Sequence, residues 1–418
     1  MKKLLASAVL GAGALALINA PSAQAGPTFY FGDGKKLTVF QMVQIWSIYG
    51  LKYDIPGETN LKDKKANIYI RRGRFGFKGS IRKDLGFKVW FAYDNLGRDD
   101  LNPNDGARGA VKTSGLNYSK MEVWDAQFTW KANPEWANIT IGYFRPQVGK
   151  ESITSGFGVL TLEKGLPNFY VRRHIIGKPD TKTTGAFSSG NGRVFNVTLG
   201  GLHKDSGWSL NYNFAFADDQ NYTDKSNWSP LLTARVAVSI GDPEMKKYKL
   251  GYKQTYFGKR NGVTIGLNYA HQGNGIDRDK NKKFDKNELY GVDLLANYGP
   301  VDIAAEYDIM KRNWNDGTNY KDTVWEVRAG YLIPIGKQFI QPVVSYEKFK
   351  PDSNGNSIKG KKENTRYDIG INWYVNKQKL KINLHYAYGE VKNYKNKNNN
   401  KTGTVKAGYL GLGLQFKF

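Results

Sequence analysis

The feature of this sequence that most constrains its fold is an alternation of apolar and polar side chains with a period of two residues, recurring from about residue 37 to residue 418. Successive side chains of a β-strand point to opposite faces, so each alternating segment predicts a strand with one apolar and one polar face. The last segment has Leu410, Leu412, Leu414, Phe416 and Phe418 on one face and Tyr409, Gly411, Gly413, Gln415 and Lys417 on the other. Because no later segment can cover the apolar face, it must meet lipid or another sheet.

The pattern predicts an all-β chain with sixteen strands. The segments are 37–53, 66–81, 85–95, 118–131, 137–145, 193–201, 207–217, 231–240, 262–272, 288–298, 301–311, 323–333, 338–349, 364–374, 378–390 and 405–418. Tight turns alternate with long polar connections, as in transmembrane antiparallel β-barrels. Residues 241–261 form a long connection where a turn is expected, and added strands at 248–257 and 183–189 would raise the number to eighteen.

The N-terminus carries an export signal. Lys2 and Lys3 precede an apolar run that ends in small residues, the pattern of a signal-peptidase site. We therefore expect a cleaved signal peptide at 1–25, a periplasmic N-terminal segment at 26–36 and the barrel domain at 37–418. A membrane anchor is the alternative, but the apolar run is too short for it.

The amino-acid composition limits which molecules the protein is expected to bind. The formal charge of +25, or +23 without the leader, predicts attraction for anions. Export argues against nucleic acid as that anion. The absence of cysteine excludes disulfides and zinc–thiolate sites. The four histidines lack metal-ligand spacing and no catalytic constellation is recognisable, so we expect neither enzyme activity nor a cofactor.

The two faces of the predicted strands differ as lipid and water require. In the segment 301–311 the odd positions are apolar, whereas Asp302, Glu306 and Asp308 lie on the even face. Only hydrogen-bonded barrels and helices can cross hydrocarbon, and a polar barrel interior indicates a water-filled channel. A soluble β-sandwich or β-helix with one wet face is the alternative.

Three stretches carry a family resemblance. Arg71–Gly79 with the following Asp84–Asp99, then Gly142–Ser155, and the C-terminal strand together resemble the phosphate-selective porin O and P family. The resemblance implies a trimeric outer-membrane porin of a Gram-negative-type bacterium, narrowed by an inward-folded third loop and lined with basic residues that favour anions. It also implies that Phe418 is recognised by the barrel-assembly machinery.

Two sets of basic residues are candidates for binding anions. The long connection 146–192 follows the fifth strand, contains the one predicted helical stretch and carries Lys150, Lys164, Arg172 and Arg173. Charges on a loop inside the barrel would act at close range on passing ions. The alternation also places Arg72, Arg74, Lys78 and Lys88 inside the barrel on the second and third strands. The alternatives are a solvated outer loop and salt bridges with inward acids.

Inward acids on the later strands keep two other functions open. A general or cation-leaning porin is favoured by seven such acids: Asp293, Asp302, Glu306, Asp308, Glu326, Glu347 and Asp368. A structural or adhesive barrel with a plugged lumen is a further alternative. Small anions, including phosphate, are the expected solutes, and the basic outer loops are expected to concentrate anions or to contact the phosphates of outer-membrane lipopolysaccharide.

Residues 277–288 resemble the spacing of a calcium loop. Asp277, Asp279, Asn281, Asp285 and Glu288 occupy ligand positions 1, 3, 5, 9 and 12. Lys282 stands where the loop requires glycine, and four lysines oppose a dication. A solvated charged loop is the alternative.

Overall fold

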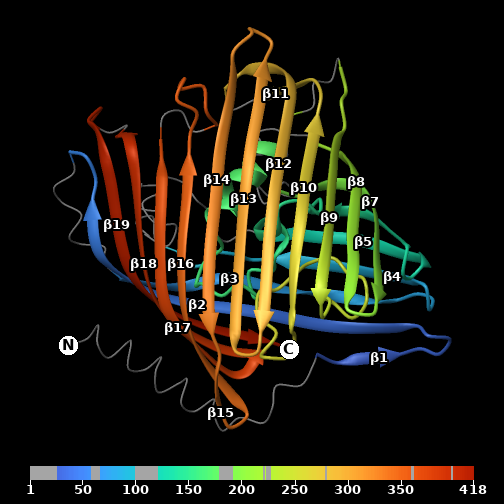
Figure 1. The fold of residues 1–418 in the computed structure, drawn as a ribbon. Coiled ribbons are helices and arrows are strands. Elements are labelled where there is room, and N and C mark those ends of the chain that lie inside the picture. The colour runs from blue at the N-terminus through green and yellow to red at the C-terminus, as the bar shows by residue number, and fades with distance from the viewer. Residues whose placement is uncertain are drawn as a thin grey trace.

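The computed structural model describes residues 26–57, 66–98, 121–177, 192–219, 222, 227–277, 280–358, 362–396 and 399–418. Sixteen antiparallel strands form a barrel that closes by pairing of β19 with β2 (Figure 1). These strands are β2 (Lys36–Asp54), β3 (Ala66–Ser80), β4 (Leu85–Ala92), β5 (Glu122–Asn133), β6 (Ala137–Phe144), β7 (Val194–Asp205), β8 (Trp208–Asp218), β9 (Leu231–Gly241), β10 (Gly262–Gln272), β12 (Lys282–Tyr298), β13 (Val301–Trp314), β14 (Asn319–Tyr331), β16 (Gln338–Lys350), β17 (Asn364–Gln378), β18 (Leu380–Lys395) and β19 (Thr402–Lys417).

The sixteen-strand prediction is confirmed. Three short strands extend the sheet, namely β1 (Thr28–Tyr30) on β2, β11 (Gly275–Asp277) on β12 and β15 (Ile333–Ile335) on β16. The eighteen-strand alternative is not realised at 248–257, because β9 and β10 pair directly with each other. That segment contributes a single bridge, from Tyr252 to Thr154. The second added strand, at 183–189, lies outside the described residues.

The alternation sorts side chains as predicted. On β13 the inward Asp302, Glu306 and Asp308 are buried, whereas Tyr307 on the outer face is 43% exposed. On β19 the inward Tyr409 is buried and the outward Leu410 is 40% exposed. Apolar side chains therefore cover the outer surface, and polar ones the interior.

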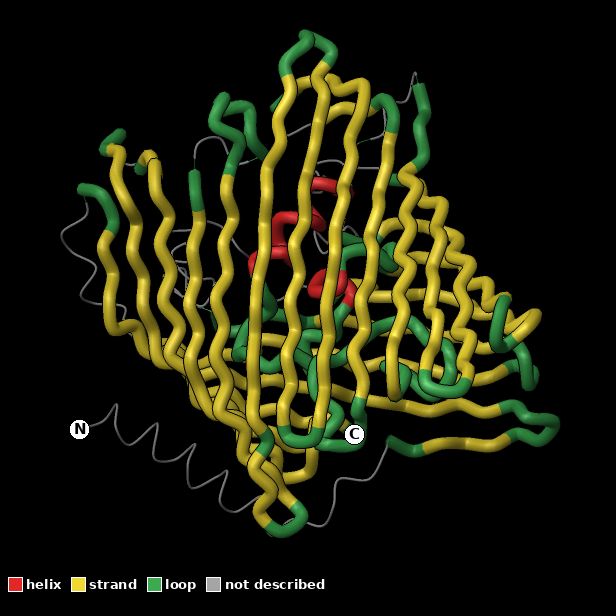
Figure 2. Tube along the Cα trace, in the orientation of Figure 1, coloured by secondary structure: helices red, strands yellow, loops and turns green. Residues whose placement is uncertain are grey.

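Two helices lie inside the ring of strands (Figure 2). Both belong to the connection between β6 and β7, and they are α2 (Lys150–Ile153) and α3 (Leu166–Ile176). Val171 and Ile175 of α3 are buried in a cluster with inward apolar residues of β10 to β16, and the rings of Tyr170 and Phe349 stack 3.8 Å apart. The interior is therefore partly filled along the later strands. Within the described residues, no helix has the length and apolar character needed to span a membrane.

Candidate pore constriction

The constriction loop, residues 145–177, is anchored on the carboxylates of the later strands. Arg328 of β14 lies 3.1 Å from Glu151, 3.0 Å from Glu326 and 3.3 Å from Glu347. Glu347 in turn accepts the backbone N–H of Leu166 at 2.9 Å. Glu326 and Glu347, two of the inward acids predicted on the later strands, are thus engaged in holding the loop.

A second set of contacts holds the loop to β17, β19 and β2. Asn372 donates to the carbonyl of Leu160 at 2.7 Å, and Gln415 donates to that of Phe157 at 3.2 Å. Leu162 packs over Gly411 and Gly413, where an added Cβ would lie 2.3 and 2.8 Å from its methyl carbons. Gly411 and Gly413 therefore leave the space that Leu162 occupies, and we call this site the seat of Leu162.

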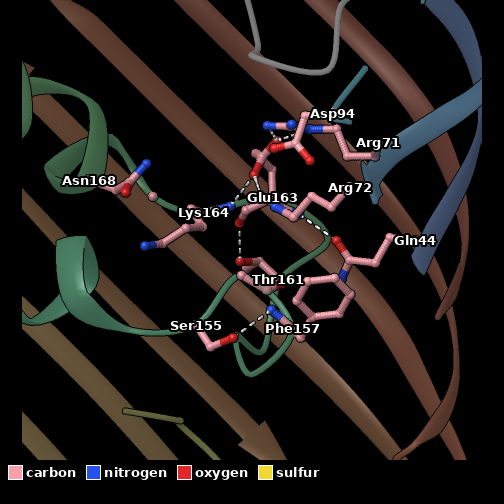
Figure 3. Close-up of polar contacts among 12 residues, drawn as sticks. Gln44, Arg71, Arg72, Asp94, Ser155, Phe157, Thr161, Glu163, Lys164 and Asn168 are labelled. Atoms are coloured by element: carbon pink, nitrogen blue, oxygen red, sulfur yellow. Dashed lines mark hydrogen bonds and ion pairs between the residues drawn. The ribbon is translucent and has the colours of Figure 1, made fainter. Parts of the chain in front are cut away.

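Glu163 holds the constriction loop to β3, one of the early strands of the barrel (Figure 3). Its carboxylate accepts from Arg71 Nε at 2.7 Å and also pairs with Arg72. Both arginines project inward because the register of β2 and β3 shifts at Gln44/Ile45, which leaves Arg71 as an extra residue between Ile70 and Arg72. A bulge of this kind sets two successive side chains on one side.

The connection 242–261 enters the barrel from the end opposite to the constriction loop. Lys150 forms an ion pair with Glu244, and both side chains are 6% exposed. Tyr252 accepts the Ser155 N–H through its carbonyl at 3.0 Å, and Gln254 donates to Glu151 at 3.0 Å. The connection is long because it serves as a support for the loop.

On the early strands, basic side chains line the interior around one tryptophan. The guanidiniums of Arg74 and Arg193 lie 3.7 and 3.8 Å from the ring centroid of Trp124. Arg74 pairs with Asp94. Asp125 pairs with both Arg193, at 2.7 Å, and Lys88, at 2.9 Å. Trp124 points inward because the register of β4 and β5 shifts at Trp90/Phe91, so strict alternation fails here too.

Partly exposed cations continue this track at both ends. Toward the loop, Arg145 and Arg172 are half-buried, and Arg145 lies within electrostatic range of Arg172, Arg193 and Arg74. At the other end Lys78 lies within range of Lys88 and Lys249. We call the set Arg172, Arg145, Arg193, Arg74, Lys88 and Lys78 the basic track.

Lys253 belongs to the connection 242–261 and lies near the end of the basic track that is formed by Lys78. Burial, followed by repulsion from Lys249, Lys417 and Lys377, lowers the pKa of Lys253 to about 8. Its ammonium lies 4.1 Å from the ring centroid of Tyr256. A cation in these surroundings is poorly compensated, which favours an anion nearby.

The structure divides the predicted site residues into two groups. Arg74, Lys78, Lys88 and Arg172 belong to the basic track, whereas Arg72, Lys150 and Lys164 hold the loop and are buried. Lys164, for example, donates to the Ser152 carbonyl at 3.0 Å. Arg173 is half-buried near the end of α3.

The two-residue alternation does not predict four residues of this region: Arg71, Trp124, Arg145 and Arg193. Arg71 and Trp124 lie at bulges, where the two-residue period breaks. Arg145 and Arg193 flank the long connection, next to β6 and β7, and a search for cations beside the ends of the fifth and sixth strands could have found them.

The calcium-loop residues lie on a β-hairpin of β11 and β12 rather than on a calcium-binding turn. Asp277 lies 2.7 Å from Arg312, and Glu288 lies 2.8 Å from Lys286. Asp279 lies outside the described residues. In the part of the chain that the structure describes, no three His, Asp or Glu side chains are placed to hold a metal ion, so this hypothesis gains no structural support.

A closed sixteen-stranded barrel with an apolar outer surface and an inward loop defines an outer-membrane porin, a channel-forming protein. The sequence profile of the phosphate-selective porin O and P family matches residues 44–418, and the chain belongs to this family. Among curated relatives, an uncharacterized protein of Aquifex aeolicus (strain VF5) is 22% identical over 345 residues, covering 78% of this chain and 77% of the relative.

Solved porins share the fold at low sequence identity. The anion-selective porin from Comamonas acidovorans matches with a TM-score of 0.55 at 13% identity, over 92% of this chain and 100% of that one. The outer membrane channel DcaP of Acinetobacter baumannii matches with a TM-score of 0.53 at 12% identity, over 94% and 100%. The trimer form of OmpT of Vibrio cholerae matches with a TM-score of 0.51 at 13% identity, over 92% and 100%.

Proposed function

We propose that this porin is a passive channel that prefers small anions, and that the basic track is the surface along which they pass. The main support is the position of Arg74 and Arg193, whose guanidinium carbons lie 3.7 and 3.8 Å from the ring centroid of Trp124. Two guanidiniums at one indole hold positive charge at a fixed place, beside the acidic partners Asp94 and Asp125. Such charge inside narrow, low-dielectric walls attracts anions and repels cations.

Exposure along the early strands supports an open passage rather than a plugged barrel. The constriction loop fills the side of the later strands, where its anchoring residues are buried. On the opposite side the inward Lys88 keeps 23% of its side chain exposed, and Arg145 and Arg172 are also accessible. The track is therefore partly accessible at Lys88, Arg145 and Arg172, whereas Arg74 and Arg193 at its centre are buried beside Trp124.

Phosphate and other oxyanions are the finer proposal. A planar guanidinium donates two parallel hydrogen bonds to an oxyanion, which an ammonium cannot do. The central position of the track is held by arginines, whereas lysines stand at its lower end. We expect phosphate to dwell at Arg74 and Arg193 and chloride to pass them quickly.

The assembly and remaining partners follow as proposals. The family and the trimeric fold relative favour a homotrimer. Phe418 closes the barrel through two backbone hydrogen bonds with Gln41, at 2.9 and 3.0 Å. This terminal strand is the segment that we expect the assembly machinery to recognise.

Planar-bilayer recording tests the function. In a potassium chloride gradient, we expect a steady conductance whose reversal potential leans toward chloride. The Arg74→Gln/Arg193→Gln variant should shift that potential toward potassium, since it removes two positive charges and leaves Asp94 without Arg74 and Asp125 with Lys88 but without Arg193. Lys83→Gln/Lys131→Gln removes the same charge from exposed positions at the turns and should change little. No current at all, or a potassium-leaning wild type, would overturn the proposal.

A second variant isolates the oxyanion preference. Arg74→Lys/Arg193→Lys keeps the charge and removes the planar fork. We expect it to retain the chloride-leaning potential but to lose much of the block of chloride current by added phosphate. Equal block in the wild type and in this variant would remove phosphate specificity while leaving anion preference intact.

A further inference from the structure

Three lysines converge on the outer, lipid-facing surface of the barrel. Lys311 of β13 and Lys321 of β14 are directly opposed in the register of the sheet. Lys350 of β16 is opposed to Thr323, two residues from Lys321 on the same face. Their neighbours Arg312, Asp322 and Phe349 are buried inside, so the three lysines project outward. We call them the outer lysine triad.

Within the described residues, the triad forms no ion pair. Nearby acids are engaged elsewhere, because Glu288 pairs with Lys286 at 2.8 Å and Glu363 pairs with Lys348 at 3.2 Å. Asp352 accepts the backbone N–H groups of Lys321 and Asn354. Like charges directly opposed on one sheet face destabilise it. Lys311 also faces Glu288 of β12, and its ammonium lies 5.1 Å from the ring centroid of Tyr290. Glu288 is paired with Lys286, so the facing lysines still favour an anion from outside the chain.

The triad lies beside a row of aromatic side chains on the same surface. Tyr307 is opposed to Trp325, whose ring lies 5.0 Å from that of Tyr346, and the ring of Tyr367 follows at 4.9 Å. Aromatic girdles of this kind mark the boundary between hydrocarbon and headgroups in barrels. The triad lies on the loop side of this row, at the end opposite to the C-terminus (Figure 1), and therefore at the headgroups of the outer leaflet.

We propose that the outer lysine triad binds the phosphate groups of an outer-leaflet glycolipid, whose acyl chains lie along the aromatic row and the apolar strands below it. Charge selects the headgroup: three ammonium groups, none of them in an ion pair within the described residues, face a dianionic phosphate. Position selects the source, since the side chains face the lipid rather than the lumen. The site is separate from the basic track, which lies inside the barrel.

The test uses the full-length porin in detergent with purified diphosphorylated lipid A as the probe. We expect lipid A to raise the melting temperature of the wild type and to remain bound in native mass spectra. The Lys311→Gln/Lys321→Gln/Lys350→Gln variant should lose most of both effects and keep its conductance and reversal potential. The matched control, Lys83→Gln/Lys131→Gln/Lys337→Gln, removes three exposed lysines from the opposite end and should behave as the wild type.

Two further arms separate the lipid from other causes. Lipid A with its phosphates removed should not stabilise the wild type, and inorganic phosphate at the same concentration should not either. Equal stabilisation of the wild type and the triad variant, or stabilisation by the dephosphorylated lipid or by inorganic phosphate alone, would overturn the proposal. Heat-modifiable migration in gels verifies that every variant has folded.

Discussion

Lys150 and Glu244 form a buried ion pair although they reach the barrel interior from opposite ends of it. Lys150 lies on the connection that follows β6, and Glu244 on the connection that follows β9. Antiparallel strands make these opposite ends of the barrel. The narrow region of this porin is thus built from two sides, and the pair joins the halves.

Breaking this pair on one side should loosen the constriction. Glu244→Gln leaves the Lys150 ammonium buried without its partner, which costs about 3 kcal/mol. We expect a lower urea midpoint in micelles and noisier single-channel currents. Because an apolar pair of similar volume avoids the buried charge, Lys150→Met/Glu244→Leu should recover most of the stability. A double variant no better than the single one would contradict this account.

Glu163→Gln should release the loop from the early wall. The carboxylate serves both Arg71 and Arg72, whose side chains are 10% and 7% exposed, so its loss leaves two poorly solvated cations. We expect a loss of about 3 kcal/mol in the free energy of unfolding. The loss of this negative charge should also strengthen the chloride preference in bilayers. An unchanged urea midpoint would show that the ion pairs contribute nothing net.

Gly411→Val should displace Leu162 from its seat. An added Cβ at this glycine would lie 2.3 Å from Cδ2 of Leu162. Overpacking of this kind costs about 2 kcal/mol. Leu162→Ala makes room, so the double variant should be more stable than Gly411→Val alone. A double-mutant cycle of urea midpoints measures this coupling, and simple additivity would argue against the contact.

Selectivity should depend on pH through Lys253. Its pKa of about 8 means that the side chain is charged below pH 8 and loses the charge as the pH rises through that value. We expect the chloride preference to weaken when the pH is raised from 7 to 9 in the compartment that faces the short turns. Lys253→Arg keeps the charge throughout this range. If the variant and the wild type respond alike, another group is responsible.

Alternation was sufficient to predict the sixteen strands and the inward Arg74, Lys78 and Lys88. It was insufficient at Arg71 and Trp124, because a bulge adds one residue to a strand and no simple sequence signal marks it. It was also insufficient for the segment 242–261. Tyr252 and Phe257 suggest a strand by composition, but their burial depends on partners in the distant constriction loop and in β17.

The local strand pattern is also insufficient to predict which inward charges line the passage. Parity correctly placed Glu326 and Glu347 inside the barrel, but their distance from the passage depends on how the loop packs against them. Arg328 contacts Glu326, Glu347 and Glu151, and the contact with Glu151 depends on the packing of the loop, which the strand pattern does not predict. Long-range loop packing, rather than local strand pattern, decides which charges an ion meets.

The seat of Leu162 has a consequence for biogenesis. Gly411 and Gly413 belong to the last strand and neighbouring Trp46 to the first, so the seat exists only after these two ends of the sheet have met. A chain whose final strand has not yet paired still offers the anchors on β14, β16 and β17, but it lacks the complete seat of Leu162. We therefore expect the contact of Leu162 with Gly411 and Gly413 to reach its final form only when β19 and β2 have paired.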